Sequence, residues 1–372
     1  MEEKKDGLSL RQLSAAAWAA VLAPAVGLMP GMTAERAGRG GWLSVLLALP
    51  VVLLLGRMVY LLTGRGKEHL AQAYCRVLGA GPGRLLGLIY MVWGVVLLAL
   101  RLRMSGQRLL FTGRRDGTLW FFLPAILAVA VWLAWGKRAV FGRAAELFFG
   151  ILIGVLGSVT LLTVFSIRPE GVWPLWTEDV PGVCGGVVPV LGTLCCGIYA
   201  GFLLDGAALP AGTGGPWKGR TVRMCLWLGA AQVSILGSFG PQLTARLEDP
   251  FLALAGQVGV EGAFQRVESL VSALLLYSDL TVLALLLWAG RRIMEQVCPR
   301  WSGAGVAAAG AVLALTGAGT GFADAVFARE FACGGMLAGN LILGLLVPAA
   351  AFAVDRVRLY GRKRSTSCGE SE

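Results

Sequence analysis

The chain has 372 residues, of which 56% are hydrophobic and only 15% are charged. Soluble domains typically hold roughly 45–50% apolar and roughly 25% charged residues, and the mean hydropathy of +0.70 departs in the same direction. The apolar residues also lie in blocks of the ~20 residues that a helix needs to cross a membrane. A soluble enzyme is therefore excluded.

Charge and metal-ligand content exclude further classes of protein. His69 is the single histidine, and the eight cysteines include no CxxC pair, so a zinc site, a redox motif or a histidine-based catalytic triad has no support. We expect no enzymatic activity and no metal or cofactor. A net charge of +11 is typical of nucleic-acid-binding proteins, but here the basic residues separate apolar blocks, as in the loops of a membrane protein. We expect a lipid bilayer, and not nucleic acid, around this chain.

Ten apolar blocks predict an all-α polytopic membrane protein with ten transmembrane helices. The blocks lie at about residues 11–33, 42–63, 85–110, 119–135, 145–167, 187–209, 221–240, 264–290, 303–320 and 333–354. The ninth block is rich in Gly and Ala, which suits close packing between helices. A cleaved signal peptide is not expected, because the first block is too long and a second span follows at once.

The distribution of Lys and Arg predicts the orientation. With the N-terminus in the cytoplasm, the inner segments carry about twice as many basic residues as the outer ones. The sequence therefore predicts a cytoplasmic N-terminal segment at residues 1–10, a transmembrane domain at 11–354, and a basic cytoplasmic tail at 355–372. Both termini would lie in the cytoplasm, with the tail next to anionic lipid.

Two of the predicted spans contain helix-breaking residues. The first carries Pro24, Gly27 and Pro30 within one apolar run. The sixth carries a longer set, namely Gly197, Tyr199, Gly201, Asp205, Gly206 and Pro210. Interrupted segments at matching positions of two halves are typical of the binding site of inverted-repeat transporters, because unwound backbone can bind a carboxylate or a cation. Ordinary kinked membrane helices are the alternative.

The eighth predicted span carries acidic residues on one helix face. Residues spaced by four, three and four positions share this face: Glu268, Ser272, Leu275 and Asp279. Asp279 lies near mid-span, so it should face the interior, with Arg101 or Arg103 among its possible partners. It is either a ligand-amine or proton-coupling carboxylate or a structural contact between helices. We interpret Glu268, nearer the outer end, as structural.

Arginines also repeat on one face of the third predicted span. Arg101, Ser105 and Arg108 are spaced by four and three residues. These side chains either line an outer vestibule or lie at a solvated helix end, and Arg101 is also a candidate structural partner within the bundle.

At the level of family, the sequence resembles the B subunit of the spore germinant receptors, the GerAB-type endospore germination permeases of the amino acid–polyamine–organocation transporter superfamily. Four stretches carry the resemblance: SLRQLSAAAWAAVLAPAVGLMPG at 9–31, AGRGGWLSVLLALPVVLLL at 37–55, RAAELFFGILIG at 143–154 and FGPQLTARLEDPFLALAGQVGVEGAFQRVESL at 239–270. The last of these, with Glu268 near its end, is the most specific. The resemblance extends over essentially the whole chain.

This resemblance implies a fold, a function and partners. The fold would be a five-plus-five inverted repeat, about 11–167 and 187–354, with discontinuous helices one and six. The function would be to bind a small nutrient germinant, typically an amino acid, in the inner membrane of a spore. The partners would be a receptor A subunit and a lipoprotein C subunit. The alternative is an H⁺- or Na⁺-coupled secondary transporter of amino acids or related organic cations.

The candidate residues follow from these patterns. We take as ligand-binding candidates Pro24, Gly27, Gly197, Tyr199, Gly201 and Ser272, and as coupling or ligand-amine carboxylates Asp279 and Asp205. The sequence departs from the family at helix six, where the family commonly carries a Glu about ten residues before the terminal Pro. Here that position is Ala200, and the acid is Asp205.

Overall fold

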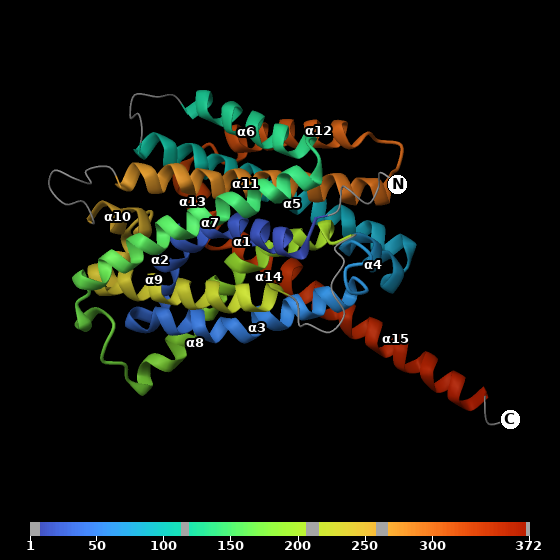
Figure 1. Cartoon of the computed structure of the whole chain (residues 1–372), viewed down its shortest axis with the longest axis horizontal. Helices are drawn as coiled ribbons and strands as arrows, with labels where there is room; N and C mark the ends of the chain where they lie inside the picture. Colours follow the sequence, from blue (N-terminus) through green and yellow to red (C-terminus); the bar gives the residue numbers. More distant parts are fainter. Residues whose placement is uncertain (1–7, 113–118, 206–215, 258–266, 370–372) are drawn as a thin grey trace.

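The computed structural model describes residues 8–112, 119–205, 216–257 and 267–369. Within these ranges the chain is helical and contains no β-strand. Eight helical segments are long and apolar enough to cross a membrane, and Leu119–Trp135 is a shorter apolar helix. Most of the helices run along the long axis of the molecule (Figure 1). The first turn of α1 lies toward the same end as helices α4 and α15.

The helices of the first half follow one another with short connections. They are α1 (Leu10–Gly27), α2 (Met29–Ala37), α3 (Gly41–Leu62), α4 (Leu70–Leu78), α5 (Ala80–Thr112), α6 (Leu119–Trp135) and α7 (Arg138–Leu162). The 3₁₀ turns of this half and of the following connection are η2 (Gly38–Gly40), η3 (Thr163–Ser166), η4 (Pro169–Gly171) and η5 (Thr177–Asp179).

The second half has more irregular helices. It contains α8 (Val180–Leu194), the 3₁₀ segment η6 (Cys195–Leu203), α9 (Pro216–Arg246), α10 (Pro250–Gln257), α11 (Val267–Val297), α12 (Gly303–Thr316), α13 (Ala325–Cys333), α14 (Gly335–Leu341) and α15 (Val347–Gly369). Two π-helical turns, η7 (Gly317–Gly321) and η8 (Ile342–Leu346), follow α12 and α14.

The apolar blocks of the sequence coincide with helices, but several boundaries differ. Helices α7 and α8 begin at Arg138 and Val180, about seven residues before the predicted starts. Pro181 lies in the first turn of α8, where proline is tolerated because its missing N–H has no partner in the helix. The short helices α4, α10 and α13 were not predicted. Residues 206–209 of the sixth predicted span, and Pro210 after it, lie outside the described residues.

A glycine allows α9 to bend where the seventh apolar block ends. Gly240 has φ +72°, a left-handed conformation that side chains with a Cβ rarely adopt. Pro241 follows it, and the helix continues to Arg246. The helix therefore extends past its apolar part in a new direction.

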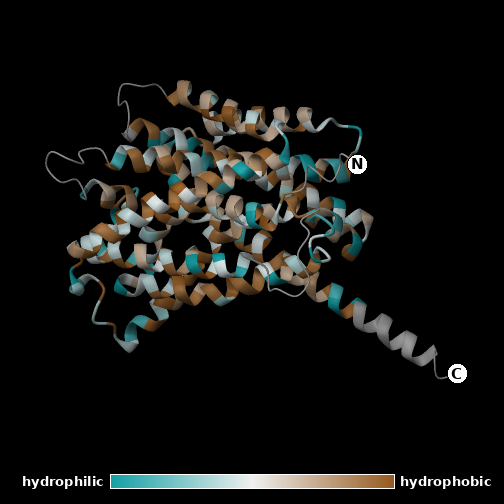
Figure 2. Cartoon of the chain, viewed as in Figure 1, coloured by the Kyte–Doolittle hydropathy of each residue, from teal (hydrophilic) through white to brown (hydrophobic). Residues whose placement is uncertain are grey.

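The outside of the bundle is strongly apolar. Phe121, Trp132 and Leu147 are 72%, 71% and 65% exposed, and hydrophobic colour covers the helices along most of their length (Figure 2). A soluble protein rarely exposes contiguous apolar surface of this extent. With the long apolar helices, this surface identifies an integral membrane protein.

Helix α1 is strongly enclosed and lies against α7, α9, α11 and η6. Every residue from Ala19 through Gly27 is buried. The first span of the sequence therefore lies inside the bundle, where its backbone is covered by other helices.

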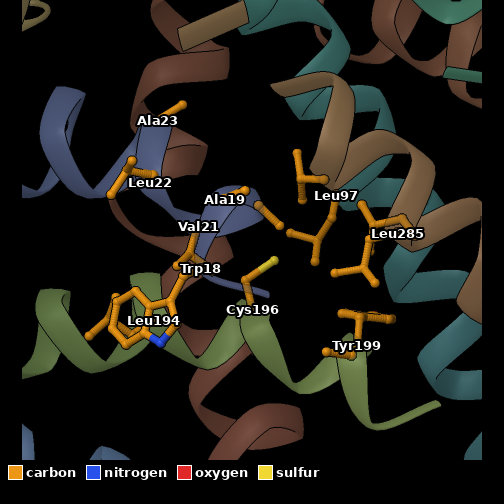
Figure 3. Packing of buried hydrophobic residues seen from close by; sticks show 14 of the residues in the cluster. Trp18, Ala19, Val21, Leu22, Ala23, Leu97, Leu194, Cys196, Tyr199 and Leu285 are labelled. Atoms are coloured by element: carbon orange, nitrogen blue, oxygen red, sulfur yellow. The ribbon is translucent and has the colours of Figure 1, made fainter. Parts of the chain in front are cut away.

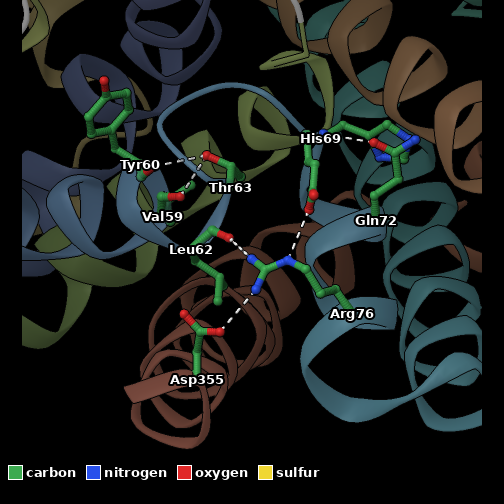
Figure 4. Close-up of polar contacts among 9 residues, drawn as sticks. Val59, Tyr60, Leu62, Thr63, His69, Gln72, Arg76 and Asp355 are labelled. Atoms are coloured by element: carbon green, nitrogen blue, oxygen red, sulfur yellow. Dashed lines mark hydrogen bonds and ion pairs between the residues drawn. The ribbon is translucent and has the colours of Figure 1, made fainter. Parts of the chain in front are cut away.

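At one end of the bundle, Arg76 of α4 joins three further segments (Figure 4). Its guanidinium donates to the Leu62 carbonyl at 2.7 Å, to Asp355 at 3.0 Å and to Glu68 at 3.1 Å. This contact holds the ends of α3 and α4 against α15.

Candidate functional site

Helix α1 receives a side-chain contact from α11. In a regular helix the Ala23 N–H donates to the Ala19 carbonyl. The Ser278 hydroxyl bonds to both of these groups: it donates to the Ala19 carbonyl at 2.5 Å and accepts from the Ala23 N–H at 2.9 Å. One turn further on, α1 ends at Gly27 and α2 begins at Met29. The first predicted span is thus divided between α1 and α2, and Ser278, which the sequence analysis did not select, contacts α1 one turn before that boundary.

The proline and glycine of the first span contribute in different ways. Pro24 is buried within α1 and has no N–H to donate, while its carbonyl accepts from the Leu28 N–H at 3.1 Å. A Cβ at Gly27 would lie 3.1 Å from the Asp249 carboxylate. Gly27 thus allows this carboxylate to approach the end of α1.

The sixth predicted span is interrupted as well. Helix α8 ends at Leu194, and the chain continues as the 3₁₀ segment η6. Long 3₁₀ stretches are uncommon and often lie at functional hinges. Figure 3 shows α1 and η6 in contact, with Cys196 of η6 pointing between Ala19 of α1 and Leu97 of α5.

One cavity lies between α1 and η6, and no residue of α11, the eighth predicted span, lines it. It has a volume of about 170 Å³ and is lined by residues of α1, α3, η6 and α9, including Val21, Gly197 and Gly201. Almost all of its lining is apolar. A Cβ at Gly197 would have Val21 at 3.8 Å, so a methyl group fits there, whereas a longer side chain would enter the cavity.

A second cavity lies on the other side of η6. It has a volume of about 280 Å³ and is lined by residues of α5, η6, α11 and α12, among them Tyr90 and Tyr199. The Tyr199 hydroxyl donates to the Tyr90 carbonyl at 2.9 Å. Tyr199 is therefore bonded to α5 and separated from Gly197 and Gly201, with which the sequence analysis grouped it.

A buried ion-pair cluster lies beside the end of α1. Arg108 of α5 donates to Asp279 at 2.5 Å and to Asp249 at 3.3 Å. The partner of Asp279 is thus Arg108, and the sequence-based expectation of Arg101 or Arg103 is wrong. Asp249 was missed, although the acidic pair before Pro250 marks a helix start: its carboxylate accepts from the Leu252 N–H at 3.2 Å.

Three of the four residues predicted to share one face of the eighth span lie buried on one face of α11, and the fourth does not. Ser272, Leu275 and Asp279 are all buried on α11, at 2%, 0% and 3% exposed, whereas Glu268 in the first turn is exposed. A Cβ at Gly256 of α10 would lie 3.5 Å from the Glu268 carboxylate. Ser272 lines neither the cavity beside Gly197 nor the one beside Tyr199.

Arg101 occupies the same face of α5 as Arg108 but has different surroundings. It is 3% exposed, and its guanidinium donates to the Met336 sulfur at 3.6 Å. Within the described residues it forms no ion pair.

Asp205 belongs to a second polar cluster, at the far end of α11. Its carboxylate accepts from Arg138 of α7 at 3.0 and 3.1 Å, and also from Arg292 of α11. Arg292 is 13 positions after Asp279, which corresponds to ~20 Å along a helix. The structure does not bring the two candidate coupling carboxylates together.

His69 lies next to this second cluster. Burial, with the positive charges of Arg292 and Arg138, lowers the pKa of His69 from 6.5 to about 4. The imidazole is therefore neutral at physiological pH. Across the described residues, no group of three or more His, Cys, Asp or Glu side chains could hold a metal ion.

Solved transporters share this arrangement of helices. MhsT, solved with L-phenylalanine, has 14% sequence identity and a TM-score of 0.61, with 94% of this chain and 88% of that chain covered. A manganese transporter from Eremococcus coleocola, solved with an aromatic bis-isothiourea substituted compound, has 15% identity and a TM-score of 0.55, over 91% and 78%. Mhp1, a nucleobase-cation-symport-1 family transporter, has 12% identity and a TM-score of 0.58, over 90% and 76%. At these identities the similarity shows the fold alone.

The family is shown by the sequence of the first half. No curated protein matches the chain, but residues 7–190 match the Spore_permease family, described as spore germination protein. The stretch at 239–270 lies beyond the matched residues. The match confirms the family inferred from the amino-acid sequence: the chain belongs to the spore germination proteins, and its fold is that of membrane transporters.

Proposed function

We propose that this protein is the membrane subunit of a spore germinant receptor. It binds a small nutrient germinant, an amino acid, in the cavity lined by α1, α3, η6 and α9, and binding signals germination through a receptor A subunit and a lipoprotein C subunit. The ten apolar blocks then form a five-plus-five inverted repeat. The membership in the spore germination protein family supports the biological role, and the interrupted helices support the binding site.

The observation that carries the proposal is a cavity between α1 and η6. Helix α8 continues there as the 3₁₀ segment η6, and Ser278 of α11 bonds to the α1 backbone at Ala19 and Ala23, close to the part of α1 that lines the cavity. Non-helical backbone within a membrane is tolerated where it lines a cavity or is covered by protein. Gly197 and Gly201 leave room there for a molecule of a few heavy atoms.

The placement of basic residues supports the orientation proposed from the sequence. Arg76, Arg138 and Arg292 join segments near the end where α1 begins and α15 leaves the bundle. A basic end is typical of the cytoplasmic side. We propose the inner spore membrane as the location, with both termini in the cytoplasm.

The test is a ligand-dependent thermal shift of the purified full chain in detergent, across the common amino acids. A ligand at 100 times its Kd stabilises a protein by ~2.7 kcal/mol, which raises the melting temperature measurably. Gly197→Leu should abolish this shift, because the leucine side chain enters the cavity.

Gly185→Leu is the matched control. Gly185 lies on α8, one element before Gly197, and a Cβ there meets no atom within 4 Å. This variant should keep the ligand-dependent shift of the wild type. If Gly197→Leu also keeps its full shift with an unchanged dose dependence, the germinant does not bind in this cavity.

The second candidate function is coupled secondary transport of amino acids or organic cations. Two observations favour it: solved structures of similar fold include transporters, and Asp279 of α11 lies buried in an ion pair with Arg108 of α5. Flux into proteoliposomes separates the two functions. Uptake of a bound amino acid that depends on an H⁺ or Na⁺ gradient would establish transport, and binding without uptake would establish a receptor.

A further inference from the structure

Arg101 is a buried cation, and most of its N–H donors have no acceptor among the described residues. Its side chain is 3% exposed, and its Nε has no hydrogen-bond partner. The Met336 sulfur, 3.6 Å from one terminal nitrogen, is a weak acceptor. A guanidinium has five N–H donors, so most of the binding capacity of Arg101 is unused within the part of the chain that the structure describes.

The nearby carboxylates do not neutralise Arg101 directly. Asp279 is close enough to act on its charge, but both Asp279 and Asp249 are bonded to Arg108. Arg101 and Arg108 are seven positions apart on α5, which is ~10 Å along the helix. An uncompensated charge in the interior is strongly unfavourable. Among the described residues, no carboxylate pairs with the positive charge of Arg101.

Arg101 faces the interrupted part of the sixth span. It lies near Cys196 of η6 and contacts Met336 of α14. The Cys196 thiol points toward the space between Ala19 of α1 and Leu97 of α5 (Figure 3). Leu97 and Arg101 are four positions apart and so lie on one face of α5. Arg101 therefore lies on the face of α5 that carries Leu97, near η6 and against α14.

We propose that Arg101 binds the carboxylate of a small ligand beside η6 and α14. Arginine suits the role because its planar fork matches the two oxygens of a carboxylate. The inference rests on the proposed function for its choice of an amino acid, but the site itself requires only a carboxylate. Bound there, the ligand supplies the negative charge that the protein does not place beside Arg101.

The experiment measures thermal shifts of the full chain with matched probes. The probes are the common amino acids, their carboxamides, propionate and chloride. We expect shifts with amino acids and none with the carboxamides, which have no negative charge. Arg101→Met should weaken carboxylate binding by about tenfold to hundredfold, the range for a hydrogen bond to a charged group, and Arg101→Lys should restore part of it.

The ligand-free proteins provide a second readout. Arg101→Met should melt no lower than the wild type, because it removes an unpaired buried charge. Arg108→Met is the control: it leaves Asp249 and Asp279 without their shared partner and should melt lower. A large loss of stability in Arg101→Met would show that Arg101 is a structural contact and would overturn the proposal.

The remaining outcomes separate this site from the germinant receptor function. Shifts with propionate that need Arg101, in the absence of shifts with amino acids, would support the carboxylate site and contradict an amino acid as germinant. Equal shifts with amino acids and carboxamides would support germinant binding and overturn the carboxylate site. A shift with chloride alone, or no shift with any carboxylate, would also overturn it.

Discussion

At the scale of single residues, the interior of this protein contains charges of two kinds. Arg108, Asp249 and Asp279 compensate one another, whereas Arg101 has no carboxylate partner among the described residues. Compensated groups contribute to packing between helices, and breaking such a buried pair is strongly destabilising. An uncompensated group is retained against its unfavourable burial, which is typical of a binding site.

His69 makes the stability depend on pH in a defined direction. Its pKa is lowered to about 4 in the folded protein and is about 6.5 in an unfolded chain. Between these values the unfolded chain takes up a proton that the folded protein does not, so stability falls as the pH drops from about 6.5 to about 4, by at most about 3 kcal/mol. We expect His69→Gln to flatten the fall in melting temperature over this range.

Comparing the wild type with His69→Gln separates the effect of the histidine from that of acidic groups that titrate in the same pH range. His69 is the single histidine, so no other imidazole contributes to the difference. Parallel melting curves of wild type and His69→Gln between pH 7 and pH 4 would contradict the lowered pKa.

At the scale of elements, the end of α1 is held by a partner helix. Helix α1 ends at Gly27, after Pro24, and one turn earlier its backbone at Ala19 and Ala23 bonds to the Ser278 hydroxyl of α11. The proline and glycine pattern therefore predicted where the helix ends and not the side chain that contacts it.

Ser278→Ala tests this contact. The change removes two buried hydrogen bonds between α1 and α11, which are worth about 1 to 2 kcal/mol together, so the melting temperature should fall. Ser269→Ala, on an exposed turn of the same helix, should leave it unchanged. An unaltered melting temperature in Ser278→Ala would mean that α1 closes its own hydrogen bond there without loss.

At the scale of the whole molecule, Asp205 connects parts that are distant in the sequence. It follows η6 and bonds to the start of α7 and to the last turns of α11. These contacts hold one end of the bundle closed near the cavity beside Gly197, whose lining includes Leu204. The carboxylate selected from the sequence as a coupling group is thus placed as a connection between helices.

Asp205→Asn should loosen this end of the bundle. It leaves Arg138 and Arg292 close together without the carboxylate that joins them, so we expect a fall in stability of about 1 to 3 kcal/mol and faster hydrogen exchange over residues 195–205. Glu295→Gln removes the more exposed partner of Arg292, which is 41% exposed, and should change stability by less than about 1 kcal/mol. Equal effects of the two substitutions would contradict a role for Asp205 in closing this end.

The sequence by itself determined the class of protein, the positions of the apolar helices, the family, and the interior face that carries Asp279. These properties follow from composition, from runs of apolar residues and from helical spacing, which are local along the chain. Asp279 was placed inside because a charge facing lipid is strongly unfavourable wherever its partner lies.

Only the tertiary structure decided which groups meet. Three contacts depend on how far each helix is rotated and shifted against its neighbours. Arg108, and not Arg101, pairs with Asp279, Ser278 bonds to the backbone of α1, and Tyr199 lines a different cavity from Gly197. A shift of one turn, ~5.4 Å, exchanges one partner for another on the same helix face. The apolar pattern is almost unchanged by such a shift, and it therefore contains no information that selects one partner over the other.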